Sequence, residues 1–407
     1  MSNSRPDCPV CHGPTRKNGK TSAGTQRWRC KDQQCNATII NPNPDVQHKH
    51  TFALFYAWIT STLSLDRFAA LHKSTRTTLA RRFYWCWLIQ PTYWIDPNRI
   101  YDQIFIDGTY FGHGTHSYCL LVAYDGDHVI CWHWCHRETK NDYLTLLEKI
   151  PHPPRIVTTD GHRGALAAIH TLWPTTHIQR CLVHVHRTIT EHLTHRPRTD
   201  AGKALLALSR TLLTITTLDQ ARTWGIHLAQ FETTYATWLK EKTYATDGQQ
   251  RPRHVKPTAT WWYTHYRQRR AVKLLVTLWR KQQLFTYLTH PNEPTQPPLR
   301  ADTNCLEGGI NAQLKHLTRI HRGQPAEHQR LTCEWYLAAR TAIPDDPTNT
   351  AEKQQWGKAQ LAKAQALHHR ETAHNNPDPE GRPAMYDRGI DSTPTNSMGI
   401  QKGWLGH

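Results

Sequence analysis

No apolar run in this chain of 407 residues approaches the ~20 residues that a membrane-spanning helix requires. The first ten residues, MSNSRPDCPV, also lack the apolar core of a secretory signal. These two absences argue against a membrane protein and predict a cytoplasmic location.

Acidic side chains are in short supply. The 32 Asp and Glu residues stand against 50 Lys and Arg residues, which leaves a formal net charge of +18. Such a surplus attracts a polyanion and makes its binding weaken as the salt concentration rises. Nucleic acid is therefore the first partner to expect, although many of the 16 tryptophans that could stack on bases will be core residues.

The 11 cysteines are an odd number scattered over a long chain. This distribution argues against a disulfide framework and favours metal ligation and buried thiols. Because domains cluster near ~100 to 200 residues, a chain of this length is expected to fold as two or more units.

Two close cysteine pairs lie near the N-terminus: Cys8, Cys11, Cys30 and Cys35. They suit a tetrahedral zinc ion held between two turns of a ribbon, and a domain this small needs such a metal to fold. Four unrelated cysteines are the alternative, since the second pair has a wider gap than the usual two residues. Arg27 and Arg29 lie between the pairs and are candidate DNA contacts.

Apolar residues recur at helical spacing from residue 52 to residue 88, in two short stretches separated by HKST. Ser74 or Thr75 is placed to cap the second helix. That helix carries three candidate DNA contacts: Arg76, Arg81 and Arg82. A short helix, a tight turn and a second basic helix form the pattern of a helix-turn-helix, which enters the major groove. An ordinary helical hairpin with a solvated basic face is the alternative.

From residue 103 the sequence pattern predicts β-strands. The segments are QIFIDGTYF, HSYCLLVAY and HVICWHWCH, with a turn at Asp125-Gly126. A helix beginning at Asn141, a strand RIVTTD, a helix HRGALAAIHTLW and a strand THIQRC follow. Three antiparallel strands, a helix, a strand, a helix and a strand make the RNase H-like order. In that order the first and fourth strands are adjacent and parallel.

An Asp-Gly dipeptide lies at the end of each of these two strands, so Asp107 and Asp160 would converge. Asp-Gly alone is weak evidence, because turns use it constantly. We assign Asp125-Gly126 and Asp247-Gly248 to turns. The placement of Asp107 and Asp160 after strands that would be neighbours favours metal ligands over turn residues.

A third acid lies in RADTNCLEGGINAQLKHLTRIH, where Asn304, Glu307, Asn311 and Lys315 fall at three- and four-residue steps. One helical face would then display a carboxylate, amides and a cation, although a solvated face would look similar. The two glycines after Glu307 suggest that something approaches the backbone closely. Asp302 is the competing third ligand.

The motifs FIDGTYF, TTDGHRG, RCLVH and NCLEGGINAQLK, in this order, resemble the Mutator-type transposases of bacterial insertion sequences. The likeness covers residues from about 5 to 340, and the zinc-ribbon-like N-terminus resembles a subset of the family. The resemblance implies that Asp107, Asp160 and Glu307 form a DDE triad. It also implies that Cys181 and His184 form the family's Cys-x-x-His pair.

Phosphodiester cleavage by three acids suits two Mg²⁺ ions ~3.5 to 4 Å apart, for which Mn²⁺ could substitute. The resemblance implies that the protein cleaves insertion-sequence ends and that a freed 3′-OH then attacks a second phosphodiester. The implied partners are terminal inverted repeats and target DNA, bound by a homodimer or larger assembly that is associated with the nucleoid.

Cys181 and His184 allow more than one role. On a helix their spacing would put both on one face, which makes half of a zinc site. The sequence offers no second pair of comparable quality. Orienting the scissile strand beside the acids is preferred over simple packing.

The sequence pattern of residues 188–300 predicts mainly helices. It indicates a helical insertion between the second and third acids, as the resemblance implies. Its stretch RPRHVKPTATWWYTHYRQRR interleaves cations with Trp261 and Trp262, which suits splayed bases at an element end. Core tryptophans beside a solvated basic face are an equal alternative.

The expected fold is multidomain and mixes α+β and α/β parts. It consists of a zinc ribbon (1–45), a helix-turn-helix domain (46–98), an RNase H-like core (99–187 and 301–343) split by an all-α insertion (188–300), and a C-terminal region (344–407). The last region is expected to hold one helix from Ala351 to about His368 and a mobile tail rich in Pro, Asn, Asp and Gly.

Two other functions stay open from the sequence. One is a sequence-specific DNA-binding regulator in which the RNase H-like core survives only as a scaffold. The other is an RNase H-like nuclease that hydrolyses DNA without strand transfer.

Overall fold

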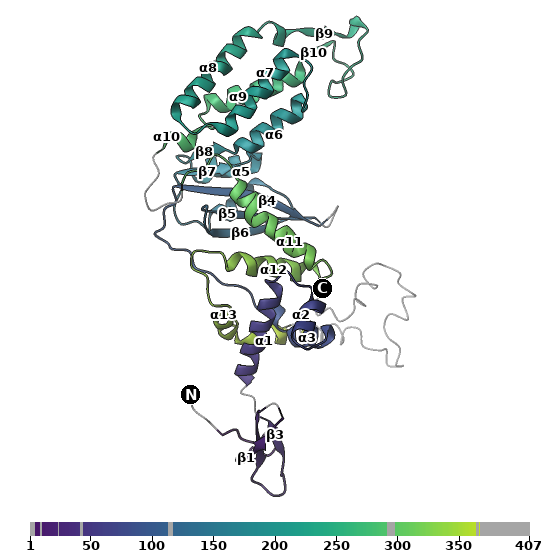
Figure 1. Ribbon diagram of the computed structural model, residues 1–407, viewed down its shortest axis with the longest axis vertical. Coiled ribbons are helices and arrows are strands. Elements are labelled where there is room, and N and C mark those ends of the chain that lie inside the picture. Colours follow the sequence, from purple (N-terminus) through teal and green to yellow (C-terminus); the bar gives the residue numbers. More distant parts are fainter. Residues whose placement is uncertain are drawn as a thin grey trace. The chain divides into compact units, whose positions relative to one another are not determined.

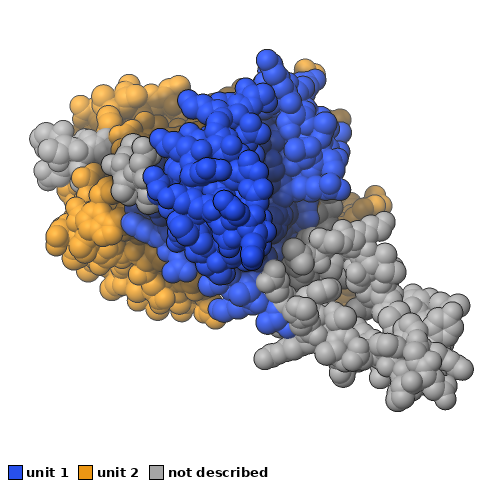
Figure 2. Space-filling view, turned by 90° about the horizontal axis from the view of Figure 1, so that it is seen from below, with its two compact units in different colours: residues 1–92, 317–336, 345–407 blue, residues 93–316, 337–344 orange. Residues whose placement is uncertain are grey.

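The computed structural model describes residues 5–8, 10–22, 24–40, 44–112, 117–290, 298–363 and 366. The chain divides into two compact units, which Figure 2 colours separately. Unit 1 comprises residues 1–92, 317–336 and 345–407, and unit 2 comprises residues 93–316 and 337–344. None of the described helices is long and apolar enough to cross a membrane.

The N-terminal part of unit 1 is a small antiparallel sheet in the order β1-β2-β3 (Figure 1). Its strands are β1 (Thr15–Lys20), β2 (Gln26–Cys30) and β3 (Thr38–Ile40). The buried side chains here are those of Cys8, Thr15 and Cys30. Because so little apolar surface is buried, the sheet cannot be held together by a hydrophobic core alone.

The rest of unit 1 is helical. It contains α1 (Pro44–Ile59), α2 (Leu65–Leu71), α3 (Arg76–Phe83), η1 (Cys86–Leu88), most of α12 (Ala326–Ala338), α13 (Pro347–Lys353) and η7 (Gln355–Gly357). Phe55 of α1, Phe83 of α3 and Trp335 of α12 belong to one buried cluster. Thr75 provides the expected cap of α3, since its side chain accepts a hydrogen bond from the Thr78 backbone N–H.

The C-terminal helix differs from its prediction. Instead of one helix from Ala351, α13 begins at Pro347 after the cap Asp346, the 3₁₀ turn η7 follows, and α-helical residues resume at 358–363. The interruption has a physical cause, because Gln355 and Trp356 adopt positive φ angles of 51° and 57° and the Trp356 side chain is buried in the unit 1 cluster. The tail that was expected to be mobile lies outside the described residues.

Unit 2 contains a five-stranded sheet in the order β6-β5-β4-β7-β8. Its strands are β4 (Gln103–Phe111), β5 (Tyr118–Tyr124), β6 (Val129–Cys135), β7 (Ile156–Thr159) and β8 (His177–Arg180). The first three pair antiparallel, and β7 pairs parallel with both β4 and β8. The predicted adjacency of β4 and β7 is therefore confirmed. Asp125-Gly126 forms the expected turn, with Asp125 Oδ1 accepting the His128 backbone N–H at 2.6 Å.

Two helices, α4 (Lys140–Leu147) and α5 (Arg163–Leu172), pack on this sheet. Ile104 and Ile106 of β4 share a buried cluster with Tyr143 of α4 and Ala165 of α5. Since side chains alternate along a strand, Asp107 is on the opposite face of the sheet. α4 starts one residue earlier than the expected Asn141, because Thr139 and Asp142 form a capping box.

A largely helical insertion follows β8. It contains α6 (Leu182–Leu193), α7 (Asp200–Thr211), η3 (Leu212–Thr214), α8 (Leu218–Thr234), η4 (Trp238–Lys240), η5 (Ala245–Asp247), α9 (Tyr266–Arg280) and α10 (Thr286–Thr289). Leu182, Trp224 and Leu275 belong to its buried cluster. Because α6 contributes to this cluster from its first residue, the insertion begins before the expected residue 188.

The insertion is not all-α, so that prediction was wrong. β9 (Lys242–Tyr244) and β10 (Trp261–Tyr263) form a two-stranded antiparallel sheet in which Trp261 pairs with Tyr244. Strands of three residues are too short for an alternating pattern to stand out, although aromatic and β-branched residues favour them. Gly248, with φ +72°, makes the expected turn after Asp247.

The segment carrying the predicted third acid returns to the sheet of unit 2. A π-helix, η6 (Cys305–Asn311), contacts β4 and continues into α11 (Ala312–Ile320). The sequence predicted a regular α-helical face here. A π-helix has a wider turn, and such turns are frequent at functional sites.

Candidate active site

Asp107 and Asp160 extend from neighbouring strands at the same level. β4 and β7 pair in parallel register up to Phe105 and Thr158, and each acid follows two residues later. Asp107 does not end its strand, as the sequence had suggested. β4 continues to Phe111 because its outer half pairs with β5, while β7 stops at Thr159. Asp107 therefore lies on a part of β4 that extends beyond the end of β7 and pairs only with β5.

The backbone around Asp160 is fixed by several donors. Asp160 Oδ1 accepts hydrogen bonds from the His162 backbone N–H at 2.8 Å and from Thr159 Oγ1 at 3.2 Å. Arg180 Nη2 donates to the Asp160 carbonyl oxygen at 2.5 Å. Gly161 has φ +90°, and a Cβ there would lie 1.8 Å from the Arg180 guanidinium carbon. Position 161 thus requires glycine for both backbone conformation and space.

Glu307 and Asn311 approach Asp107 from η6. The buried Asn311 donates from Nδ2 to Asp107 Oδ2 at 2.8 Å, across 204 positions of the chain. The pKa of Asp107 is raised to about 7, mainly by burial and then by the negative charges of Glu307 and Asp160, while the imidazole of His184 lowers it. A carboxyl group whose pKa rises because of two other acids lies in electrostatic reach of both.

The other residues of the predicted polar face do not join this group equally. Asn304 and Lys315 are exposed, whereas Asn311 is buried. Asp302 Oδ1 accepts the Asn304 backbone N–H at 2.9 Å, which is the local role of a turn aspartate. A Cβ at Gly308 or Gly309 would meet nothing within 4 Å, so no described protein atom makes the close approach expected there.

Cys181 and His184 lie beside Glu307. Cys181 precedes α6 and is buried, and His184 Nδ1 lies 3.3 Å from Glu307 Oε1. The Cys181 sulfur raises the pKa of His184, as do the charges of Glu307 and Asp160, while burial lowers it. Ligand atoms of Cys181, His184 and Glu307 all lie within 4.8 Å of one another. Both residues are thus neighbours of an acid of the predicted triad.

Sequence reasoning missed a fourth acid, Glu138. Its carboxylate accepts a hydrogen bond from Tyr143 Oη at 2.5 Å and lies 3.9 Å from His162 Nδ1. The charges of Glu138, Asp160 and Asp107 all raise the pKa of Tyr143, after burial. Glu138 precedes the helix cap Thr139, where acids are common at helix starts, so its sequence position gave no signal.

The donor set of this site fits Mg²⁺ or Mn²⁺. Carboxylate oxygens are the ligands that these hard cations prefer, and the mutual repulsion that raises the pKa of Asp107 is what a cation would relieve. Asn311 Oδ1 is buried without a hydrogen-bond partner among the described residues and would be an additional acceptor beside such a cation. Asp107, Asp160 and Glu307 are the residues that would hold the ions.

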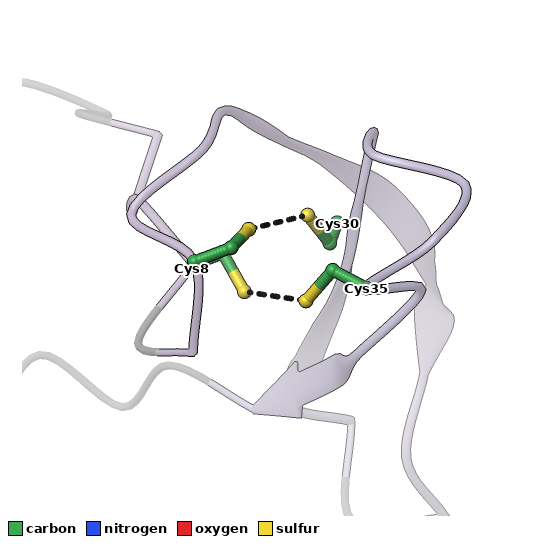
Figure 3. A group of neighbouring side chains, drawn as sticks. Cys8, Cys30 and Cys35 are labelled. Atoms are coloured by element: carbon green, nitrogen blue, oxygen red, sulfur yellow. Dashed lines mark hydrogen bonds between the residues drawn. The ribbon is translucent and has the colours of Figure 1, made fainter.

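The four N-terminal cysteines form a second candidate metal centre. Their sulfurs lie within 4.8 Å of one another, with Cys8 to Cys35 at 3.6 Å and Cys11 to Cys30 at 3.4 Å. Figure 3 shows the sulfurs turned toward a common space. Four sulfurs at ~2.3 Å from a tetrahedral zinc ion would be ~3.8 Å apart, so the cluster can hold zinc. Hydrogen bonds, first from the backbone N–H groups of Cys11 and Val10, lower the pKa of Cys8 to about 7, whereas burial raises the pKa of Cys30 to about 12.

The candidate DNA contacts divide into exposed and tethered side chains. Arg27 and Arg81 are exposed, whereas Arg29 donates to Asn36 Oδ1 at 2.6 Å. Arg82 Nη2 donates to Thr51 Oγ1 of α1 at 3.4 Å, and Arg76 lies 3.8 Å from Asp66. In the insertion, Trp261 is 38% exposed but Trp262 is only 8% exposed. Trp262 is therefore a core residue in the described structure.

Residues 115–244 match the family model described as "Transposase, Mutator family". This match confirms the resemblance to Mutator-type transposases and supports a transposase role. The matched range contains Asp160, Cys181 and His184 but neither Asp107 nor Glu307.

A search of the curated proteins finds no match. Among solved structures, the chain is similar to one in the "CryoEM structure of simian T-cell lymphotropic virus intasome in complex with PP2A regulatory subunit B56 gamma", at 15% identity. The similarity covers 47% of this chain and 74% of that chain with a TM-score of 0.17, which carries no argument about the fold.

Proposed function

We propose that this protein is a DDE transposase with an RNase H-like catalytic core, which cleaves the ends of an insertion sequence and transfers them to target DNA. The observation that carries the proposal is the hydrogen bond from Asn311 to Asp107, because it brings the helix turn of Glu307 to the sheet edge that also bears Asp160. The Mutator-family match supports the DNA substrate.

The three acids are assigned to divalent-metal binding. Bound Mg²⁺ would supply activation of the attacking oxygen and stabilisation of the leaving 3′ oxygen. Asn311 holds Asp107 through its Oδ2 atom, and the His162 N–H holds Asp160 through its Oδ1 atom. These contacts fix the direction of each carboxylate before DNA arrives. The same arrangement would serve cleavage by water and joining by a 3′-OH.

The remaining parts are assigned to DNA binding. The Cys₄ cluster would hold structural Zn²⁺ in a ribbon, as in the zinc-ribbon subset of the family, and α2 and α3 would act as a helix-turn-helix on terminal inverted repeats. Joining two element ends to one target requires at least two copies of the chain, so we propose a dimer or larger assembly on DNA in the bacterial nucleoid.

Strand transfer is tested with purified protein, a labelled DNA fragment that carries the element end, a target plasmid and Mg²⁺. We expect joined products, and we expect Asp107→Asn and Glu307→Gln to abolish them while DNA affinity is retained. Asp302→Asn is the matched control, because an asparagine there still accepts the Asn304 N–H and the competing acid is removed. If Asp302→Asn abolishes joining and Glu307→Gln does not, the assignment of Glu307 is wrong.

The same assay separates the other two functions. Hydrolysis without joined products would indicate a nuclease, and binding without cleavage would indicate a regulator. The cluster of acids that raises the pKa of Asp107 favours the enzyme, because a scaffold gains nothing from buried mutual repulsion.

A further inference from the structure

Thr303 connects two of the site's features that the proposed function treats separately. It is fully buried and lies one helical turn before Glu307, whose backbone N–H donates to the Thr303 carbonyl oxygen at 2.9 Å. Thr303 Oγ1 donates to Glu307 Oε1 at 2.5 Å. Its backbone N–H and its Oγ1 lie 3.4 Å and 3.3 Å from Cys181 Sγ.

The protons in this group can be assigned from the donor inventory. A carboxylate only accepts, so the single hydroxyl proton of Thr303 is directed to Glu307 Oε1. Cys181 Sγ accepts the Thr303 backbone N–H and lies 3.3 Å from Thr303 Oγ1. The result is a continuous buried chain of contacts that runs from Cys181 Sγ through Thr303 to one oxygen of Glu307.

Cys181 also ties this chain to the second acid. Its backbone N–H donates to the Thr159 carbonyl oxygen at 2.9 Å, immediately before Asp160. The thiol and Thr303 are 122 positions apart in the chain. Cys181 therefore fixes the turn that carries Glu307 to the strand end that carries Asp160.

His184 lies beside the same oxygen of Glu307. Arg187 Nη1 lies 3.2 Å from His184 Nε2, and because a guanidinium only donates, Nε2 must accept. The imidazole Nδ1 lies 3.3 Å from Glu307 Oε1 as an ion-pair contact and makes no hydrogen bond there. Among the described residues, Glu307 Oε2 receives no hydrogen bond or ion pair.

We propose that Thr303 is a positioning residue that, together with Cys181 and His184, holds Glu307 by its Oε1 atom and leaves Oε2 to bind the divalent cation. The Cys-x-x-His pair thus acts on the third acid rather than on the scissile strand. This inference rests on the proposed function, since it assumes that Glu307 is a metal ligand. Outer hydrogen-bond partners of metal ligands typically contribute about 10- to 100-fold to metal affinity or activity.

Thr303→Val tests the inference because valine keeps the shape and removes the hydroxyl. Mn²⁺ binding to the full chain is followed by electron paramagnetic resonance, and the Mg²⁺ concentration for half-maximal end cleavage is measured in parallel. We expect Thr303→Val to weaken Mn²⁺ binding and to raise that Mg²⁺ concentration, each by about 10-fold or more. Thr303→Ser, which keeps the hydroxyl, should restore both.

Thr286→Val is the matched control. Thr286 is buried in the same unit, and its hydroxyl donates to the Ile178 and Gln282 carbonyl oxygens, away from the acids. A loss of Mn²⁺ affinity equal in Thr286→Val and Thr303→Val would mean general loosening of the fold and would overturn the inference. If Thr303→Val does not fold, Cys181→Ser, which keeps an acceptor for the Thr303 backbone N–H, and Cys181→Ala, which does not, must differ in Mn²⁺ affinity.

Failure of the inference and failure of the proposed function give different results. If Glu307→Gln loses Mn²⁺ binding and Thr303→Val keeps it, the positioning role is wrong and the triad stands. If neither Glu307→Gln nor Asp107→Asn changes Mn²⁺ binding, the metal site itself is wrong.

Discussion

The carboxylate of Glu138 fills the space that a side chain at position 108 would need. A Cβ on Gly108 would lie 2.7 Å from the Glu138 carboxyl carbon and 2.7 Å from its Oε1 atom. Gly108 is in the middle of β4, where no turn occurs. The glycine after Asp107 is thus explained by close packing against an acid on the other face of the sheet.

Gly108→Ala should therefore destabilise unit 2. Overpacking of a buried position typically costs about 1–3 kcal/mol, and displacing Glu138 would also disturb its hydrogen bond to Tyr143. Thermal unfolding measures the effect. Gly323→Ala is the control, since a Cβ there meets nothing within 4 Å and should change the stability by less than about 0.5 kcal/mol. Equal stability of Gly108→Ala and Gly323→Ala would contradict the packing explanation.

The sequence located much of this fold because its strand and turn signals were local. The segments QIFIDGTYF and RIVTTD became β4 and β7, and their order predicted a parallel pair. The register that brings Asp107 level with Asp160 also follows from that pairing. The strand and turn signals themselves depend on residues within a few positions of one another.

Other features could not be predicted because they depend on long-range packing. Glu138, Thr303 and Arg180 carry no local signal of their contacts with Gly108, Cys181 and Gly161, which are made only when the chain folds. The wide turn of η6 and the short β9–β10 sheet were missed for the same reason. Periodicity describes regular elements, and neither of these is long or regular enough.

Zinc removal should unfold the β1–β3 sheet, because little apolar surface is buried there. We expect a single zinc ion per chain, lost in Cys8→Ser and in Cys30→Ser, with increased hydrogen exchange confined to the sheet. Cys305→Ser is the control, since Cys305 lies outside the cluster. Retention of zinc by both cluster variants would instead point to Cys181, His184 and Glu307 as the zinc site.

The stability of the metal-free protein should fall as the pH rises from about 4 to about 7. The pKa of Asp107 is raised from 3.8 to about 7, so over this range the folded state binds more protons than the unfolded state. Ionisation of the buried carboxyl then costs free energy, up to about 1.4 kcal/mol per pH unit. Asp107→Asn should lose this slope and be the more stable protein at pH 8 in Mg²⁺-free buffer. Parallel stability curves of the two proteins from pH 4 to pH 8 would show that Asp107 is not the titrating group.

Arg81 should contribute more to DNA affinity than Arg82. Both are in the last turn of α3, but Arg82 is tethered to Thr51 while Arg81 is exposed. Arg81→Ala is expected to weaken DNA binding. It should also reduce the slope of the logarithm of the binding constant against the logarithm of the salt concentration by about 1 in magnitude, as the loss of one phosphate contact does. Binding titrations at several salt concentrations measure both quantities. A larger effect from Arg82→Ala than from Arg81→Ala would place the DNA on another face of the helix.

Trp261 and Trp262 are neighbours in the sequence but should respond differently to replacement by alanine. Trp261 is 38% exposed, lies beside the exposed Tyr244 and has Lys242 Nζ over its ring at 4.0 Å. A base stacked on such a surface is worth about 1–3 kcal/mol, so Trp261→Ala should weaken binding to single-stranded DNA without changing the stability of the protein.

Trp262 is only 8% exposed, so Trp262→Ala should mainly lower the unfolding temperature. Fluorescence anisotropy with a labelled oligonucleotide and thermal unfolding of both variants separate the two roles. If both tryptophan variants bind single-stranded DNA as tightly as the parent protein, the β9–β10 sheet is not a base-stacking surface. The positive charge of the insertion must then act on the phosphate backbone alone. The DNA affinity should fall as the salt concentration rises, and it should show no preference for unpaired bases.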